Sequence, residues 1–171
     1  MNTRRIILTG LLSAVLILLQ VALSFLPNIE VVTTLIIIYT LVFDKKVFYI
    51  IYTFALLEGI IYGFGIWWIN YLYIWTILAI ITMVFRKNSS VILWAVISGF
   101  YGLIFGLLCS IPYFFIGGIG AGAAYWVSGI PMDIVHCAGN AVLTFILFQP
   151  VYRILVKLNN NMFPVHPGSH V

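Results

Sequence analysis

Long apolar runs separated by short polar or basic breaks extend along the whole chain, and this pattern predicts six helices. The runs are continuous rather than alternating, which favours membrane-spanning helices over the strands of a membrane barrel. A helix rises about 1.5 Å per residue, so about 20 apolar residues cross a bilayer. The predicted segments are 6–25, 28–43, 46–63, 69–85, 91–115 and 132–156.

The predicted segments differ in how they begin and end. The first has no short apolar core followed by a cleavage site, so we expect a retained span rather than a signal peptide. The second is short for a span, which suits a locally thin bilayer or a start inside a cavity. The glycine-rich stretch 116–126 is expected to form the longest outer connection, as a flexible lid or a loop close to a ligand. We expect one domain, 1–158, followed by a polar tail, 159–171.

Composition makes the chain an integral membrane protein. Hydrophobic residues account for 64% of the 171 residues and charged residues for 7%, whereas soluble domains carry roughly 25% charged residues. The basic residues fall into four clusters, and the positive-inside rule places all of them on the cytoplasmic face. The sequence therefore predicts an all-α membrane protein with six transmembrane helices and both termini cytoplasmic. The clusters are Arg4 and Arg5, Lys45 and Lys46, Arg86 and Lys87, and Arg153 and Lys157.

The stretch SGIPMDIVHCAGN, residues 128–140, carries the most distinctive polar pattern. On a helix, the spacing of Asp133, His136 and Asn140 puts the three side chains on one face. Pro131 suits the first turn of a helix, so this polar face would lie at the outer end of the last span. Ionisable groups inside a membrane are candidates for function. The alternative is that Asp133 caps the helix and the other two side chains bond to neighbouring helices.

The outer ends of the other spans carry further polar and aromatic groups. Glu30 and Glu58 lie there, and concave binding sites combine a few polar groups with aromatic walls in this way. The alternative for the aromatic residues is an interfacial belt at the membrane surface. Neither cysteine has the spacing of a metal site, so no metal or cofactor is expected. The candidate ligand-binding residues are Glu30, Glu58, Trp67, Trp68, Tyr71, Tyr125, Asp133, His136 and Asn140.

The first segment contains a pair of small residues at helical spacing. Gly10 and Ala14 lie four residues apart, with Ser13 beside them. Small residues at this spacing allow another helix to approach closely, so they are candidates for docking a partner. The alternative is that they pack against other helices of the same chain.

The whole pattern resembles the substrate-binding S-components of energy-coupling factor (ECF) vitamin transporters, over roughly residues 4–157. The resemblance rests on size, on the six predicted helices, on the small-residue pair in the first helix, and on two stretches. These are FLPNIEVVTTLIIIYTLVF and GIPMDIVHCAGN. In the second, a proline, an acidic residue, a histidine and an asparagine recur as in the last helix of many S-components. Within the family, the chain is most similar to the cobalamin branch. The family's first-helix motif usually begins with alanine, and Gly10 keeps that position small.

The resemblance implies a binding subunit in a multi-pass cell membrane of the bacterial type, and no enzyme. Such a subunit binds a vitamin, here cobalamin, from the outer side. It docks onto a membrane coupling protein with two ATPase subunits and topples to release the vitamin inside. Consistent with this, the sequence has no nucleotide-binding motif and no pairing of a nucleophile with a base. No nucleic-acid partner is expected.

Two other classes of function remain open at this point. One is an intramembrane enzyme with Asp133 and His136 as an acid–base pair. The other is a small channel or proton-coupled carrier with the three outer carboxylates as relay groups. The charges also bear on the ligand, because no lysine or arginine lies on the predicted outer half. An anionic ligand would lack a cation there, which disfavours folate and favours a neutral or cationic vitamin: cobalamin, thiamine or riboflavin.

Overall fold

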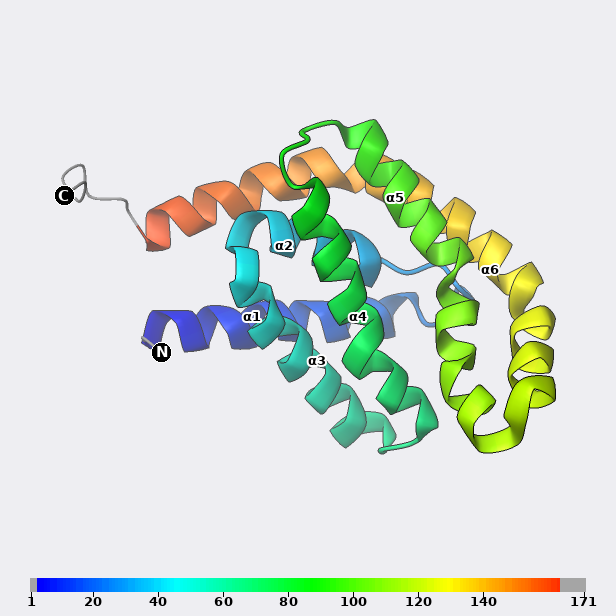
Figure 1. Ribbon diagram of the computed structural model, residues 1–171. Coiled ribbons are helices and arrows are strands. Elements are labelled where there is room, and N and C mark those ends of the chain that lie inside the picture. The colour runs from blue at the N-terminus through cyan, green and yellow to red at the C-terminus, as the bar shows by residue number, and fades with distance from the viewer. Residues whose placement is uncertain (1–2, 164–171) are drawn as a thin grey trace.

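The computed structural model describes residues 3–163, which fold into helices with no strand in that range (Figure 1). An irregular segment, 24–31, separates the first two helices, and tighter turns join the others. The all-helical prediction is therefore confirmed for these residues. The elements are α1 (Thr3–Leu23), α2 (Val32–Phe43), the 3-10 turn η1 (Asp44–Lys46), α3 (Val47–Tyr62), α4 (Ile66–Phe85), α5 (Val91–Leu103) and α6 (Phe105–Met162).

The element α6 consists of two helices joined at Gly118, so residues 3–163 contain seven α-helical segments, of which α5 and the first arm of α6 are separated by Ile104 alone. Gly118 has φ 75° and ψ −175°, a backbone conformation that glycine adopts without a steric penalty. Figure 1 shows the chain reversing direction there, in the yellow-green hairpin. The predicted long loop over 116–126 is therefore wrong, because helix continues on both sides of this single residue. Stacking of Tyr113 on Tyr125, with ring centroids 4.2 Å apart, joins the two arms of the hairpin.

The last helical segment is longer than predicted at both ends. It continues from Gly118 to Met162, so the first residues of the tail expected at 159–171 are helical, and residues 164–171 lie outside the described part. Pro131 lies in the interior of this helix and not in its first turn, so that prediction is wrong. A proline there removes a backbone hydrogen bond and favours a bend, and Figure 1 shows this helix curving.

Other boundaries differ by a few residues. The second helix begins at Val32 and not at residue 28, because Asn28 has φ 56° and belongs to the irregular segment. The fourth begins at Ile66, since Gly63 makes the turn with φ 89°, so Trp67 and Trp68 lie in the first turn of a helix. Asn and Gly set these helix boundaries because they adopt the positive φ of a turn. The apolar pattern continues through both positions and does not mark the boundaries.

The short helix α2 lies at the centre of the bundle. Its 12 residues extend about 18 Å, less than the thickness of a bilayer core. All of α2 except Leu41 and Val42 is buried, and the helix contacts each of the other five helices. Protein therefore replaces lipid around α2, and this explains how so short a segment is accommodated.

The outer surface of the bundle is strongly apolar. Side chains such as Val84, Phe115 and Ile119 are 71%, 86% and 81% exposed. Three helical stretches in the described part are long and apolar enough to cross a membrane: Thr3–Leu23, Ile66–Phe85 and Val91–Met162. An apolar surface of this extent is compatible with insertion into lipid and would be a liability in water.

The basic clusters gather at one end of the bundle. Arg5 of α1, Lys46 and Asn159, near the end of α6, line one cavity. Arg86, at the end of α4, lines another cavity together with Tyr152 of α6. The helix ends that carry the four clusters are thus neighbours in space, although they are far apart in the sequence. Figure 1 shows both described ends of the chain on this side.

Three glycines, two on α5 and one on the first arm of α6, allow these segments to approach the second arm of α6 closely. Gly99, Gly102 and Gly106 face the stretch of α6 that carries Asp133, His136 and Cys137. A Cβ atom on Gly102 would lie 2.8 Å from the carbonyl oxygen of His136. The amide N–H of Gly106 donates to Asp133 Oδ1 at 3.0 Å. This contact positions the polar face of α6, so the glycines matter for the site as well as for packing.

We therefore expect G102V to destabilise the protein, because the valine side chain would clash with the backbone of α6. Overpacking of this kind costs about 1–3 kcal/mol. The measurement is the apparent Tm of the purified protein in detergent. G10V is the matched control, because a Cβ on Gly10 meets no atom within 4 Å, and we expect its Tm to stay close to that of the parent. Equal Tm values for the two variants would contradict the close packing.

Candidate functional site

A cavity of about 250 Å³ lies where the irregular segment 24–31 meets α1, α4 and α6. It is at the far end of the bundle from the basic clusters: Gln20, which lines it, follows Arg5 by 15 residues, or about 22 Å along α1. The cavity mixes apolar walls with a few polar groups, as ligand sites do. Its lining residues are Gln20, Leu23, Ser24, Leu26, Pro27, Asn28, Ile29, Glu30, Val32, Tyr71, Trp75, Phe105 and His136.

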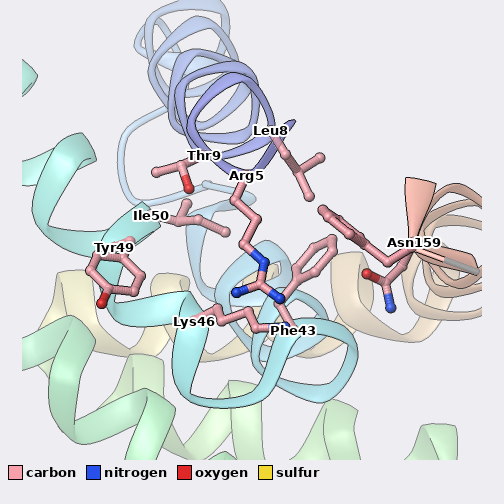
Figure 2. Close-up of a pocket in the computed structure, with 9 residues that line it drawn as sticks. Arg5, Leu8, Thr9, Phe43, Lys46, Tyr49, Ile50 and Asn159 are labelled. Carbon is pink, nitrogen blue, oxygen red and sulfur yellow. The ribbon is translucent and has the colours of Figure 1, made fainter. Parts of the chain in front are cut away.

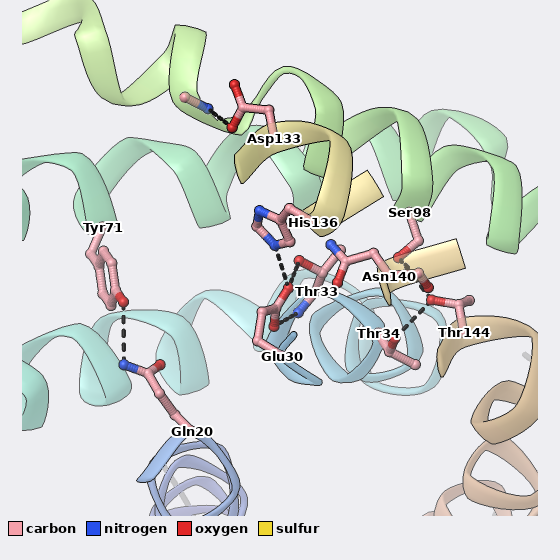
Figure 3. Close-up of polar contacts among 11 residues, drawn as sticks. Gln20, Glu30, Thr33, Thr34, Tyr71, Ser98, Asp133, His136, Asn140 and Thr144 are labelled. Carbon is pink, nitrogen blue, oxygen red and sulfur yellow. Dashed lines mark hydrogen bonds and ion pairs between the residues drawn. The ribbon is translucent and has the colours of Figure 1, made fainter. Parts of the chain in front are cut away.

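Glu30 and His136 form the polar centre of this cavity. His136 Nε2 lies 3.1 Å from Glu30 Oε1, and the two side chains are 3% and 18% exposed. Glu30 also accepts hydrogen bonds from the hydroxyl and the backbone N–H of Thr33, at the start of α2 (Figure 3). The edge of the Phe105 ring packs against the imidazole, with centroids 4.9 Å apart. These contacts fasten the irregular segment to α6 and leave one imidazole nitrogen, Nδ1, without a partner among the described residues.

A second polar group connects α1, α3 and α4 beside the cavity. The Gln20 side-chain amide donates to Glu58 Oε2 at 3.1 Å. It also donates to the hydroxyl of Tyr71 at 3.2 Å (Figure 3). Glu58 is 1% exposed, and its other oxygen has no partner in the described chain. Glu58 does not line the cavity, but it reaches the cavity wall through Gln20.

The predicted face of Asp133, His136 and Asn140 exists, and all three side chains are buried. Only His136 lines the cavity. Asp133 lies inside α6, so it does not cap that helix, and it accepts from Gly106 instead. Asn140 is 0% exposed, and neither atom of its amide group has a partner among the described residues. Asp133 and His136 bond to different groups, Gly106 and Glu30, and not to each other.

A buried hydroxyl network lies next to Asn140. The Thr144 hydroxyl bonds to the hydroxyls of Thr34 and Ser98, both at 2.7 Å. The Ser98 hydroxyl donates to the backbone carbonyl oxygen of Asn140 at 3.4 Å. These bonds tie α2 and α5 to α6 (Figure 3). Interhelical bonds of this kind stabilise membrane bundles, so this part of the polar face holds the helices that carry the site.

The predicted aromatic residues have different positions. Tyr71 lines the cavity and stacks on Phe54, with centroids 5.9 Å apart, while Trp67 packs edge-on against Tyr71 at 5.4 Å. Trp68 donates its indole N–H to the backbone oxygen of Ala55 at 2.7 Å, a contact between α4 and α3. Tyr125 lies in the hairpin and not at the cavity. The structure thus brings Glu30, Tyr71 and His136 to one cavity, with Glu58 and Trp67 directly behind its wall.

Sequence reasoning missed Gln20, Trp75 and Phe105. Gln20 had a signal, because it is a polar residue within an apolar segment, and such residues are candidates for function. Trp75 and Phe105 had none, since nothing in the sequence separates them from other aromatic residues. Trp75 is 2% exposed, and its indole N–H has no partner among the described residues. It is therefore a donor available to a ligand in the cavity.

The chemistry of the cavity suits recognition of a small polar molecule. Among the described lining residues there are a carboxylate, an imidazole, two amides, an aliphatic hydroxyl, an indole N–H and a phenol, and neither lysine nor arginine. A carboxylate without a nearby cation disfavours an anionic ligand and favours a neutral or cationic one. Within residues 3–163, no group of three or more His, Cys, Asp or Glu side chains could hold a metal ion. Comparison of the chain with protein-family models, curated proteins and solved structures finds no match, so the assignment of function depends on this geometry.

Proposed function

We propose that this chain is the substrate-binding S-component of an ECF-type vitamin importer, with six membrane crossings and both termini in the cytoplasm. One observation carries the proposal: a cavity with apolar walls and a polar centre of Glu30 and His136 lies at the end of an apolar bundle opposite to its basic clusters. A subunit that captures a neutral or cationic vitamin from outside requires a site of this kind. The chain would bind the vitamin and leave ATP hydrolysis to two partner subunits.

The distribution of charge supports this orientation. The basic clusters lie together at one end of the bundle, as expected for a cytoplasmic face. Glu30, Glu58 and Asp133 lie away from that end, in or near the cavity and its supporting helices. The cavity would then open toward the outside.

The first helix supports docking on a coupling protein. Gly10 is exposed, and no other part of the described chain occupies the space beside it. Ile7 and Leu11 extend this face, at 61% and 55% exposed. Ser13 points inward and donates to the Ile50 backbone oxygen at 3.0 Å, so it belongs to internal packing. The proposed docking face therefore consists of Gly10, Ile7 and Leu11, with Ala14 at its edge.

Cavity size bears on the choice of vitamin. The resemblance favours cobalamin, a ligand much larger than the cavity of about 250 Å³. Cobalamin would bind only if the irregular segment 24–31 moved away from the α5–α6 hairpin. Thiamine and riboflavin are smaller, and the aromatic wall of Tyr71 and Trp75 offers stacking or cation–π contacts to either. Cobalamin is thus the proposed ligand, with the two smaller vitamins as alternatives.

Direct titration of the purified protein with cobalamin, thiamine, riboflavin and folate tests the proposal. We expect one of the first three to bind and folate to leave the protein unaffected, since the cavity lacks a cation. Isothermal calorimetry supplies the affinity, and the absorption spectrum identifies a coloured vitamin that co-purifies. Expression with a coupling protein and two ATPases should yield a complex. Tight binding of folate alone would refute the charge argument, and product formation by the isolated chain would favour an enzyme.

A further inference from the structure

A second cavity, of about 290 Å³, lies at the basic end of the bundle. It is enclosed by the first turns of α1, by the junction of η1 with α3, and by the end of α6. Figure 2 shows the Arg5 side chain reaching into it toward Lys46, with Tyr49 and Asn159 on its two sides. None of the residues assigned to vitamin binding lines this cavity, so it is a separate site.

The two cations in this cavity lack a carboxylate partner among the described residues. The sequence has four acidic residues, and Asp44 is the one at this end, where it pairs with Arg86 at 3.0 Å. Arg5 and Lys46 instead lie over the ring of Phe163, at 5.7 and 6.0 Å from its centroid. One aromatic ring thus holds two like charges close together. Such a pair attracts an anion, because a shared negative group offsets their mutual repulsion.

An apolar groove continues from the cavity along α3. This groove shares Arg5, Lys46 and Tyr49 with the cavity and is otherwise lined by Lys45, Phe48, Tyr52, Thr53 and Leu56. Three cations therefore lie at one end of the groove, and mainly apolar side chains follow toward the middle of the bundle. The order of charge and then apolar surface matches a molecule with an anionic head and a hydrocarbon tail.

We propose that this site binds an anionic phospholipid of the cytoplasmic leaflet. The phosphate accepts hydrogen bonds from Arg5 and Lys46, and one acyl chain lies along Tyr52 and Leu56 of α3. Basic pockets between membrane helices on the cytoplasmic side recognise lipid head groups in this way. The groove favours a lipid over a free phosphate ion, which would leave the apolar part unused. The inference needs membrane insertion but not vitamin binding, so either proposal can fail alone.

The test uses full-length protein and native mass spectrometry, with phosphatidylglycerol and phosphatidylcholine of identical acyl chains as probes. Each basic residue near a head group contributes about 1 kcal/mol, so R5Q/K46Q should weaken phosphatidylglycerol binding about 30-fold. K87Q/K157Q is the matched control, because it removes two charges at the same end of the bundle but outside the cavity. Its affinity should stay within about threefold of the parent. L56W, which fills the groove and keeps every charge, should also weaken binding.

Three results would overturn the proposal. Equal losses in the two double variants would mean that general surface charge attracts the lipid. Equal affinity for phosphatidylcholine would remove the role of the anionic head group. Inorganic phosphate that competes as strongly as phosphatidylglycerol would assign the cavity to a soluble anion. If R5Q/K46Q does not insert into the membrane, the L56W variant provides the test. Unchanged lipid affinity in L56W would contradict binding of the acyl chain in the groove. Vitamin titration of the same samples reports separately on the other site.

Discussion

H136A is expected to weaken vitamin binding roughly ten- to hundredfold, and E30Q by a similar factor. Loss of one good hydrogen bond to a ligand costs about 1–3 kcal/mol. Both side chains line the cavity, and each positions the other through the 3.1 Å contact between His136 Nε2 and Glu30 Oε1. The affinity of purified variants, measured by calorimetry, tests this expectation. Because the two residues act as a pair, E30Q/H136A should lose less than the sum of the single losses.

D133N is the matched control for this prediction. Asp133 is buried on the same helical face as His136, but it bonds to Gly106 and does not line the cavity. Its substitution should lower the Tm more than the affinity, whereas H136A should lower the affinity in a protein that remains monodisperse. If D133N and H136A weakened binding equally, the whole polar face would contact the ligand. Unchanged affinity in H136A and E30Q would exclude this cavity as the vitamin site.

G10W is expected to abolish uptake by cells while vitamin binding to the isolated protein is retained. A side chain at this position begins in open space, because Gly10 is exposed and nothing lies within 4 Å of its Cβ position. The same side chain would prevent another helix from approaching α1 closely. Accumulation of labelled vitamin in cells, compared with binding to purified protein, separates the two effects. A14W should act in the same direction with some loss of stability, since Ala14 is half-buried.

The control is V96W, on the exposed face of α5. Val96 is 61% exposed, so a tryptophan there adds the same bulk to the lipid-facing surface. We expect V96W to support uptake close to that of the parent. Poor vitamin binding by G10W would show that the first helix shapes the ligand site, and the docking assignment would then be wrong. Normal uptake by G10W would place the partner on another face.

The local signals in the sequence were sufficient for the all-helical fold class and for the approximate positions of most helices. Continuous apolar runs and few charges favour membrane-spanning helices, because backbone groups in lipid must be satisfied within each segment, and the all-helical structure with its long apolar helices is compatible with this. The spacing of Asp133, His136 and Asn140 placed them on one face of a helix, which the structure confirms. The same local reasoning failed at 116–126, where the glycines suggested a loop. Small residues are tolerated in membrane helices, so only the one with positive φ, Gly118, marks the turn.

Tertiary structure decided which polar residues meet. Glu30 and His136 are separated by 106 positions in the chain, and nothing local to either residue indicates the other. Their contact depends on the short buried helix α2, on the irregular segment before it, and on the glycines that bring α5 and the first arm of α6 close to the second arm of α6. The pocket of Arg5 and Lys46 arises in the same way, from helix ends that are distant in sequence. Composition and periodicity report on structure over a few turns of one helix. A cavity forms where separate helices pack together, and the order of residues along one helix does not specify that packing.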